Sequence, residues 1–245
     1  MLKYTVALVA LAVAAPALAQ IKGAGEVGAV SARGNTDTDN LNAKLDLSYV
    51  RDEWKNAFNA AALYGSNDDI TSANRWETRW QSDYNYTPRN FWFGGLRYER
   101  DHFGAFSYQQ SAAAGIGYKF IDTEPTKLSA QIGGGVKKSR EQTLVEDDSG
   151  AVIDRIDGAT TTSALITAGA NFEHELTATT KIVDKLNIET DRENTFIQND
   201  IALQVAINAK FSLALGYGIR KSTSPAPDSD SMDTITTLNL VYKIE

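Results

Sequence analysis

The sequence predicts an all-β protein: a transmembrane antiparallel up-and-down β-barrel of about 12 strands, with short periplasmic turns and longer acidic extracellular loops. Three observations predict this fold class. Apolar and polar side chains alternate with a period of two in segment after segment. Several segments contain about ten residues or more, which suits a strand that crosses a membrane at a tilt. The connections between the segments alternate in length, as they do in outer-membrane barrels.

The chain begins with an expected secretory signal peptide at residues 1–19. Lys3 precedes an apolar run over 5–15, and Ala17-Leu18-Ala19 fits the small-x-small cleavage pattern. The apolar run is short for a membrane-spanning helix, which needs about 20 residues. We therefore expect residues 20–245 to form a single outer-membrane β-barrel domain.

The composition narrows the possible partners. The chain carries a formal net charge of −7 and has no cysteine. An acidic chain without basic clusters argues against nucleic acid as a partner. Without cysteine, the exported domain has no disulfide bond to stabilise it.

The first six strands are expected at about 23–33, 40–50, 54–64, 73–86, 91–101 and 107–120, each bounded by turn-forming residues. In the second strand, Leu41, Ala43, Leu45, Leu47 and Tyr49 alternate with Asn42, Lys44, Asp46 and Ser48. The fourth contains RWETRWQSDYNY at 75–86, where all the rings share one parity and the charged side chains share the other. The sixth, YQQSAAAGIGYKF at 108–120, alternates in the same way. Such alternation places one set of side chains on each face of a strand.

The other six strands are expected at about 127–139, 160–175, 180–190, 195–208, 211–221 and 233–244. In 195–208, Ile197, Ile201, Leu203 and Val205 oppose Gln198, Asp200 and Gln204. The two last segments repeat this pattern, with Leu213 and Leu215 in one and Leu238 and Leu240 in the other. An even number of strands places both ends of the domain on the periplasmic side.

The connections follow from these boundaries. The short ones are expected at 51–53, 87–90, 121–126, 176–178 and 209–210, and the longer ones at 34–39, 65–72, 101–106, 140–159, 191–194 and 222–232. Pro88, Pro125, Pro225 and Pro227 all fall in connections, as expected for a residue without an amide donor.

Aromatic side chains gather near the ends of the strands and predict two lipid-interface belts. The predicted belt residues are Trp54, Trp76, Trp80, Tyr84, Tyr86, Trp92, Tyr118, Phe120 and Tyr242, with Phe91 beside the same short turn as Trp92.

The opposite parity predicts a lumen lined by charges of both signs. The predicted lumen-lining residues are Lys44, Asp46, Arg75, Glu77, Arg79, Asp83, Arg97, Glu99, Lys119, Lys137, Lys185, Glu189, Asp200, Arg220 and Lys243. Charges inside a barrel must be paired or hydrated, because desolvating one alone costs several kcal/mol. Two interpretations stay open: ion pairs that fill the lumen as a structural plug, or a narrow water path that selects solutes.

Five segments carry a family resemblance: GEVGAVSARGNTDTDNLNAKLDLSY (25–49), WKNAF (54–58), NRWE (74–77), NFWFGGLRYERDHFGAFSYQQSAAAGIGYKF (90–120) and KLSAQIGGGVKKSRE (127–141). The chain resembles the salt-induced outer membrane protein family, a domain-of-unknown-function family of Gram-negative outer-membrane β-barrels. The resemblance implies an outer-membrane location and no assigned activity. Many outer-membrane barrels end on an aromatic residue that the assembly machinery recognises, whereas here Tyr242 precedes Lys243, Ile244 and Glu245.

The predicted function is that of a barrel in the cell outer membrane, either structural or a narrow passive channel for small solutes or ions. We predict no enzyme activity, catalytic residue, cofactor or metal site. One alternative is a soluble exported β-barrel that binds an apolar ligand, since alternation alone does not tell which face is inside. Another is a barrel lipid hydrolase, for which Asp101, His102 and Ser107 flank one loop.

The expected partners are outer-membrane lipids, lipopolysaccharide and the barrel-assembly machinery, with the protein as a monomer. Divalent cations are a further candidate, because carboxylates gather in the outer loops. These carboxylates are Asp37, Asp39, Asp68, Asp69, Glu146, Asp147, Asp148, Asp154, Asp157, Asp228, Asp230 and Asp233. DSDSMD at 228–233 lacks the glycine and the distal glutamate of a calcium loop.

Overall fold

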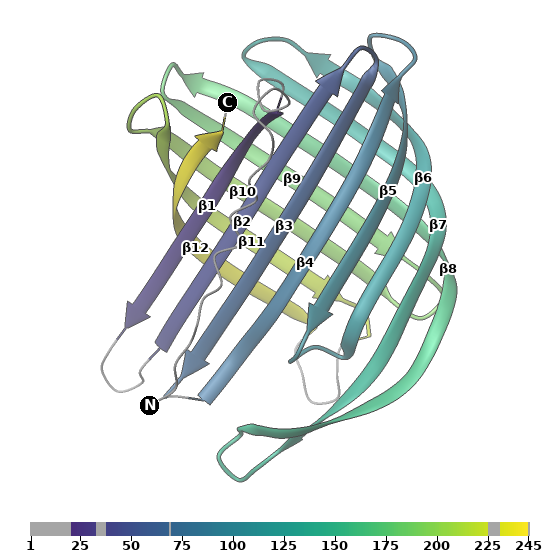
Figure 1. Ribbon diagram of the computed structural model, residues 1–245, viewed down its shortest axis with the longest axis vertical. Helices are drawn as coiled ribbons and strands as arrows, with labels where there is room; N and C mark the ends of the chain where they lie inside the picture. Colours follow the sequence, from purple (N-terminus) through teal and green to yellow (C-terminus); the bar gives the residue numbers. More distant parts are fainter. Residues whose placement is uncertain (1–20, 33–37, 69, 225–230, 245) are drawn as a thin grey trace.

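The protein is a closed barrel of twelve antiparallel strands (Figure 1). A computed structural model describes residues 21–32, 38–68, 70–224 and 231–244. The strands are β1 (Ile21–Ala32), β2 (Thr38–Arg51), β3 (Trp54–Asn67), β4 (Ile70–Asn85), β5 (Asn90–Asp101), β6 (Phe106–Asp122), β7 (Thr126–Glu146), β8 (Val152–Thr177), β9 (Thr180–Thr190), β10 (Thr195–Ala206), β11 (Phe211–Ser222) and β12 (Met232–Ile244). Each strand pairs with its neighbours in sequence, and β1 pairs with β12 to close the sheet. The predicted fold class is confirmed.

The two ends of the barrel differ. One end, here called the short-turn end, holds the connections 52–53, 86–89, 123–125, 178–179 and 207–210. The first residues of β1 and the last residues of β12 lie at this end, where Gly23 pairs with Ile244. The opposite end, here called the loop end, holds the other connections. The expected signal peptide and the 228–230 part of DSDSMD fall outside the described residues.

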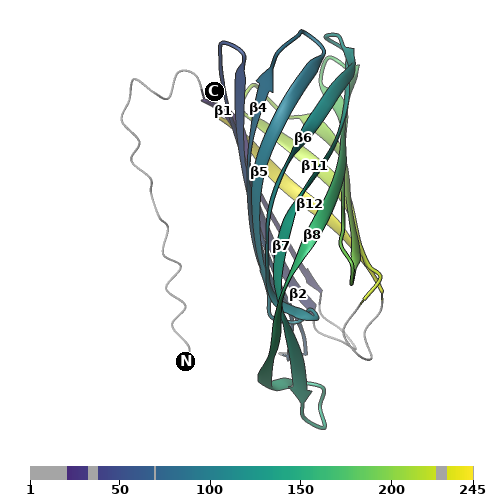
Figure 2. The same ribbon diagram turned by 90° about the vertical axis from the view of Figure 1, so that its right-hand side faces the viewer.

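Two connections at the loop end are shorter than the sequence predicted. β3 and β4 continue to Asn67 and from Ile70, so most of the expected 65–72 loop is strand. β7 and β8 continue through the expected 140–159 loop and form a hairpin that projects beyond the barrel (Figures 1 and 2). Acidic side chains are compatible with this solvated hairpin because they find cross-strand partners, as Asp157 does with Arg140 at 3.2 Å.

Glycines on β6 and β7 make room for two rings inside the wall of β5. Phe91 and Phe93 are both buried. A Cβ at Gly117 would lie 2.0 Å from the Phe91 ring, so the ring fills the space that a side chain there would need. The assignment of Phe91 to a lipid-interface belt is therefore wrong. Phe91 shares its parity with Arg97 and Glu99, and parity decides the face.

The outer wall is largely apolar. Exposed side chains on it include Leu96, Ile116, Ile132, Ile166 and Leu215. Acidic side chains also occur on this parity. Asp184 lies on the outward parity of β9 and accepts a hydrogen bond from Asn199 of β10 at 2.7 Å. No helix long and apolar enough to cross a membrane occurs among the described residues.

Candidate functional site

Polar contacts cross the inside of the barrel. Strands that are not neighbours in the sheet exchange ion pairs, among them β5 with β9, β4 with β11 and β2 with β10. Side chains of non-adjacent strands can meet only across the lumen. The predicted alternation therefore brings these charged side chains together, although it does not say which ones meet.

Arg97 of β5 is the centre of the most buried group. Its guanidinium lies 3.3 Å from Glu77 of β4 and 3.4 Å from Glu189 of β9, and it also pairs with Glu99 on its own strand. The Arg97 side chain is 4% exposed and that of Glu99 is 6% exposed. At this burial, a guanidinium with several carboxylate partners holds the side chains around it in place through charge-assisted hydrogen bonds.

Arg220 of β11 completes the group from the opposite wall. It lies 3.2 Å from Glu99 and 3.5 Å from Glu77. Both guanidinium groups also face the ring of Phe196 on β10, at 5.3 Å for Arg97 and 5.6 Å for Arg220. We call these six residues, Glu77, Arg97, Glu99, Glu189, Phe196 and Arg220, the ion-pair layer. The layer joins five strands and bridges the lumen between opposite walls.

A second set of ion pairs is less buried. Lys185 of β9 lies 3.3 Å from Asp46 of β2, and Lys44 lies 3.8 Å from Asp200 of β10. Asp46 also accepts a hydrogen bond from Asn59. These four charged side chains are 34% to 43% exposed, so water reaches this part of the lumen.

Two other predicted lumen residues, Arg79 and Asp83, have neutral hydrogen-bond partners. Arg79 donates to Asn187 of β9 rather than to a carboxylate. Asp83 accepts a hydrogen bond from Gln81 at 2.7 Å, and Gln81 also reaches Gln131 of β7 at 3.0 Å. Lys119 is half-buried near the short-turn end of β6. Side-chain contacts across the lumen therefore continue from the ion-pair layer toward the short-turn end.

Above the ion-pair layer, toward the loop end, lies a small cavity of about 160 Å³. Arg75, Asp101, Phe103 and Arg220 contribute to its lining. The Arg75 guanidinium lies 3.8 Å from Asp101. The 102–105 connection folds over this region because Gln142 of β7 donates to the carbonyls of Asp101 (2.9 Å) and Gly104 (2.8 Å).

A further buried ion pair lies at the rim of the lumen, at the loop end of the barrel. Lys137 of β7 lies 3.0 Å from Asp191, which follows β9. Burial raises the pKa of Asp191, but the backbone N–H groups of Glu193 and Asn194 and the Lys137 ammonium lower it more, so the pKa lies below its usual value. The Asn194 side-chain oxygen accepts hydrogen bonds from Ser222, Thr223 and Ser224 and ties this connection to β11.

The residues considered for a hydrolase do not form a dyad. The Ser107 hydroxyl donates to the Arg140 carbonyl at 3.4 Å. Partial burial, with Arg100 and Arg155 nearby, lowers the pKa of His102. His174 pairs instead with the Thr126 hydroxyl at 2.8 Å, beside the short turn.

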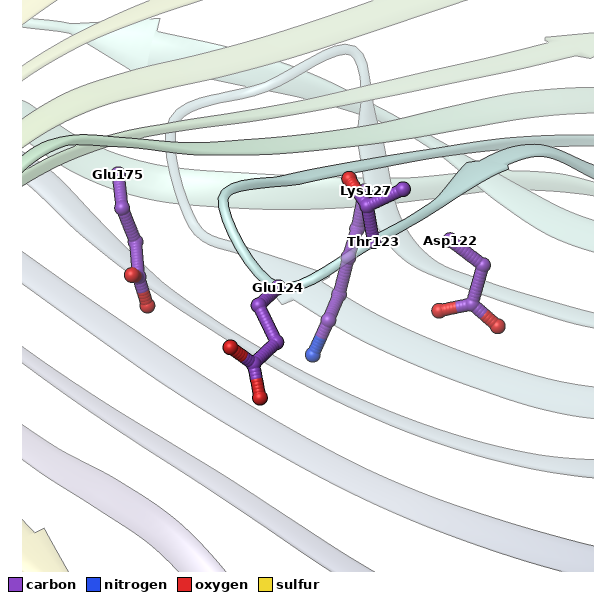
Figure 3. Close-up of a pocket in the computed structure, with 5 residues that line it drawn as sticks. All are labelled: Asp122, Thr123, Glu124, Lys127 and Glu175. Atoms are coloured by element: carbon purple, nitrogen blue, oxygen red, sulfur yellow. The ribbon is translucent and has the colours of Figure 1, made fainter.

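The described residues contain no group of three or more side chains suited to hold a metal ion. A surface depression of about 440 Å³ lies at the short-turn end (Figure 3). Asp122, Thr123, Glu124, Lys127 and Glu175 line it. It is distant from the ion-pair layer and open to solvent.

The predicted interface aromatics lie on the outer wall. Trp54, Trp76, Trp80, Tyr86, Trp92, Phe120 and Tyr242 are exposed, whereas Tyr84 and Tyr118 are half-buried. Tyr84 packs on Trp54 and Tyr118 packs on Phe120, both with ring centroids 5.0 Å apart. That these rings contact lipid stays a prediction.

Phe196, Asn187 and Asp191 were not among the predicted lumen positions. Glu189 is a predicted position, and it shares the inward parity of Lys185 on its strand. Phe196 and Asn187 are also on inward parity. Asp191 lies in a connection, and nothing in its neighbourhood in the sequence indicates Lys137 as a partner.

Comparisons with known proteins give a family and a set of similar architectures. A family model described as "Protein of unknown function, DUF481" matches residues 25–244. The uncharacterized protein YdiY of Escherichia coli (strain K12) is 24% identical over 224 residues, which cover 89% of this chain and 81% of that protein. These matches confirm the predicted family resemblance.

Two solved structures are similar over most of this chain. The NanC porin has a TM-score of 0.47 at 7% identity, with 91% of this chain and 97% of that chain covered. An outer membrane channel from Pseudomonas putida F1 has a TM-score of 0.46 at 11% identity, with 91% and 94% covered.

Proposed function

The chain belongs to the DUF481 family of proteins of unknown function, and we propose that it is an outer-membrane β-barrel whose lumen is closed by the ion-pair layer. The observation that carries this proposal is the polarity of the two faces. Buried ion pairs occupy the inside, and exposed Leu, Ile, Trp and Tyr side chains occupy the outside. In water, an apolar outer wall of this extent would be unfavourable, whereas in a bilayer it is required.

The same polarity argues against the soluble alternative. A barrel that binds an apolar ligand needs an apolar lumen, and this lumen carries Arg97, Glu99 and Arg220 at its centre. The absence of a Ser–His contact at Ser107 and His102 likewise gives the hydrolase alternative no geometric support. We infer a structural, non-enzymatic envelope protein that is monomeric.

A second candidate function is a narrow passive path for small solutes or ions. The half-exposed side chains of Lys44, Asp46, Lys185 and Asp200 favour it, because they show that water occupies part of the lumen. Such a path would still have to pass the ion-pair layer. The closed barrel is therefore the principal proposal.

The membrane part of the proposal is tested by two neighbouring substitutions. Trp80 is on the outer wall, whereas Gln81 is hydrogen-bonded inside. An arginine on a lipid-facing wall costs about 2–4 kcal/mol at mid-bilayer, and one inside the lumen is hydrated or paired. We expect Trp80→Arg to reduce the heat-modifiable folded form in the outer-membrane fraction far more than Gln81→Arg does. Equal effects, or recovery of the wild-type protein with the soluble periplasmic fraction, would contradict the proposal.

A further inference from the structure

Positive charge gathers at one place on the outer wall of this acidic chain. Two adjacent rows of residues run across β4 to β8 near the loop end. The pairing places Trp76, Arg100, Tyr108, Arg140 and Thr160 in one row. Thr78, Tyr98, Gln110, Lys138 and Thr162 form the row beside it, toward the short-turn end. We call Arg100, Lys138 and Arg140, with the rings of Trp76, Tyr98 and Tyr108, the cationic patch.

The three cations point outward. Arg100 is exposed and follows the buried Glu99 on β5. Lys138 is exposed between Lys137 and Ser139, which are both buried inside. Because side chains alternate along a strand, Arg100 and Lys138 must lie on the outer wall.

These cations are incompletely neutralised by the protein. Among the described residues, no carboxylate lies within ion-pair distance of Arg100 or Lys138. Arg140 pairs with Asp157 at 3.2 Å, and its Nε is buried without a hydrogen-bond partner. Arg100 and Lys138 thus have donors and charge left for an anion.

The aromatic rings connect the cations to the apolar wall. The Trp76 and Tyr98 rings lie 5.1 Å apart, and those of Tyr98 and Tyr108 lie 6.3 Å apart and nearly parallel. Farther toward the short-turn end, the outward side chains on these strands include Leu96, Ile116 and Val136, all exposed. From the middle of the wall to the loop end, the surface therefore changes from aliphatic side chains to two rows in which rings and cations lie side by side.

This change matches the change in a lipid leaflet from the acyl chains to the interface, where aromatic rings and lipid phosphates lie at similar depth. We propose that the cationic patch binds the phosphate-bearing headgroup of a lipid in the outer leaflet, with its acyl chains along Leu96 and Val136. Guanidinium groups suit this role because they bind phosphate in a bidentate manner. A free anion in solution would not need the apolar wall below the patch. The inference rests on the proposed membrane location.

The test uses the full barrel reconstituted in nanodiscs, with lipopolysaccharide as the probe and native mass spectrometry or titration as the measurement. The variant Arg100→Gln/Lys138→Gln removes two charges from the patch. The control variant, Arg51→Gln/Lys210→Gln, also removes one arginine and one lysine charge, but at the short-turn end, where the Arg51 side chain is 72% exposed. We expect the patch variant to bind at least about tenfold more weakly and the control variant to bind like the wild type. We also expect Arg100→Lys, which keeps the charge but loses the bidentate geometry, to bind more strongly than Arg100→Gln and more weakly than the wild type.

Dephosphorylated lipopolysaccharide and inorganic phosphate separate the possible ligands. The wild type should bind the dephosphorylated lipid as weakly as the patch variant binds the intact lipid, and millimolar inorganic phosphate should not displace the lipid. Unchanged binding by the patch variant, full binding of the dephosphorylated lipid, or displacement by inorganic phosphate would each overturn the inference. Insertion and heat-modifiable migration are measured first. Failure to insert would contradict the proposed function, whereas insertion without selective lipid binding would contradict only this inference.

Discussion

At the scale of single residues, Arg97 holds together the most buried ion pairs of the lumen. Its guanidinium is the shared partner of Glu77, Glu99 and Glu189, and its side chain is almost completely buried. Loss of one partner in such a group is much more harmful than loss of a surface pair, because the remaining charges stay desolvated without compensation. The less buried pair of Lys44 and Asp200 provides a comparison inside the same lumen.

We expect Arg97→Ala to lower the free energy of unfolding by about 3–5 kcal/mol, since it leaves three carboxylates without their shared cation. Lys44→Ala, which breaks a 3.8 Å pair of half-exposed groups, should cost about 0–1 kcal/mol. Urea-induced unfolding in lipid vesicles measures both. A loss of similar size in the two variants would show that burial of the ion-pair layer does not contribute to stability.

Asp191 at the rim predicts a pH dependence. Its pKa in the folded protein is lowered, against the effect of burial, by the N–H groups of Glu193 and Asn194 and by Lys137. A lowered pKa means that the ionised form contributes stability above the ordinary aspartate pKa of about 3.9, and that this contribution is lost as the pH falls through the folded value.

We therefore expect Asp191→Asn to lower the melting temperature at pH 7 and to lose this effect as the pH falls below about 4. Thermal unfolding in detergent between pH 3 and 7 measures the difference, with the exposed Asp148→Asn as the control. A difference between wild type and Asp191→Asn that is constant across this range would rule out the ionised carboxylate as its source.

At the scale of elements, the β7–β8 hairpin stands apart from the barrel wall. In the described part of the chain, β7 has no strand partner other than β8 beyond the Phe106–Glu141 pair. Few contacts tie the hairpin back to the barrel: Gln142 reaches the 102–105 connection, and Arg155 donates to the His102 carbonyl at 3.0 Å. Its folding thus depends on local pairing rather than on the lumen.

We expect the barrel to fold without the tip of this hairpin. Replacing residues 144–155 by Asn-Gly, a preferred two-residue hairpin turn, should preserve heat-modifiable migration and change the melting temperature by only a few degrees. The control variant carries a Gly-Ser insertion at 148–149 that is as long as the segment removed from the shortened variant. If the control folds and the shortened variant does not, the hairpin takes part in forming the wall.

At the scale of the whole molecule, alternation in the sequence predicts the twelve strands, the pairing order and the face of residues such as Trp80 and Gln81. It does not predict which opposite-wall side chains meet, because this depends on strand stagger around the closed barrel. Glu189 lies 92 residues from Arg97, and no local pattern connects the two. The acidic residues of 140–159 predict a loop, whereas in the structure most of this segment, including its β-branched residues, pairs as the ends of β7 and β8. Proximity to a turn predicts an interface position for Phe91, but its parity places the ring inside, where it is buried against Gly117.

The central claim is that the ion-pair layer closes the lumen. Planar-bilayer conductance of the refolded protein tests it most directly, with Arg97→Ala/Glu99→Ala compared with the charge-matched Lys44→Ala/Asp200→Ala. The account predicts no resolved current steps for the wild type and the control variant, and stepwise currents for Arg97→Ala/Glu99→Ala after equal insertion. Stepwise currents through the wild type, or a silent Arg97→Ala/Glu99→Ala barrel that has inserted normally, would contradict it.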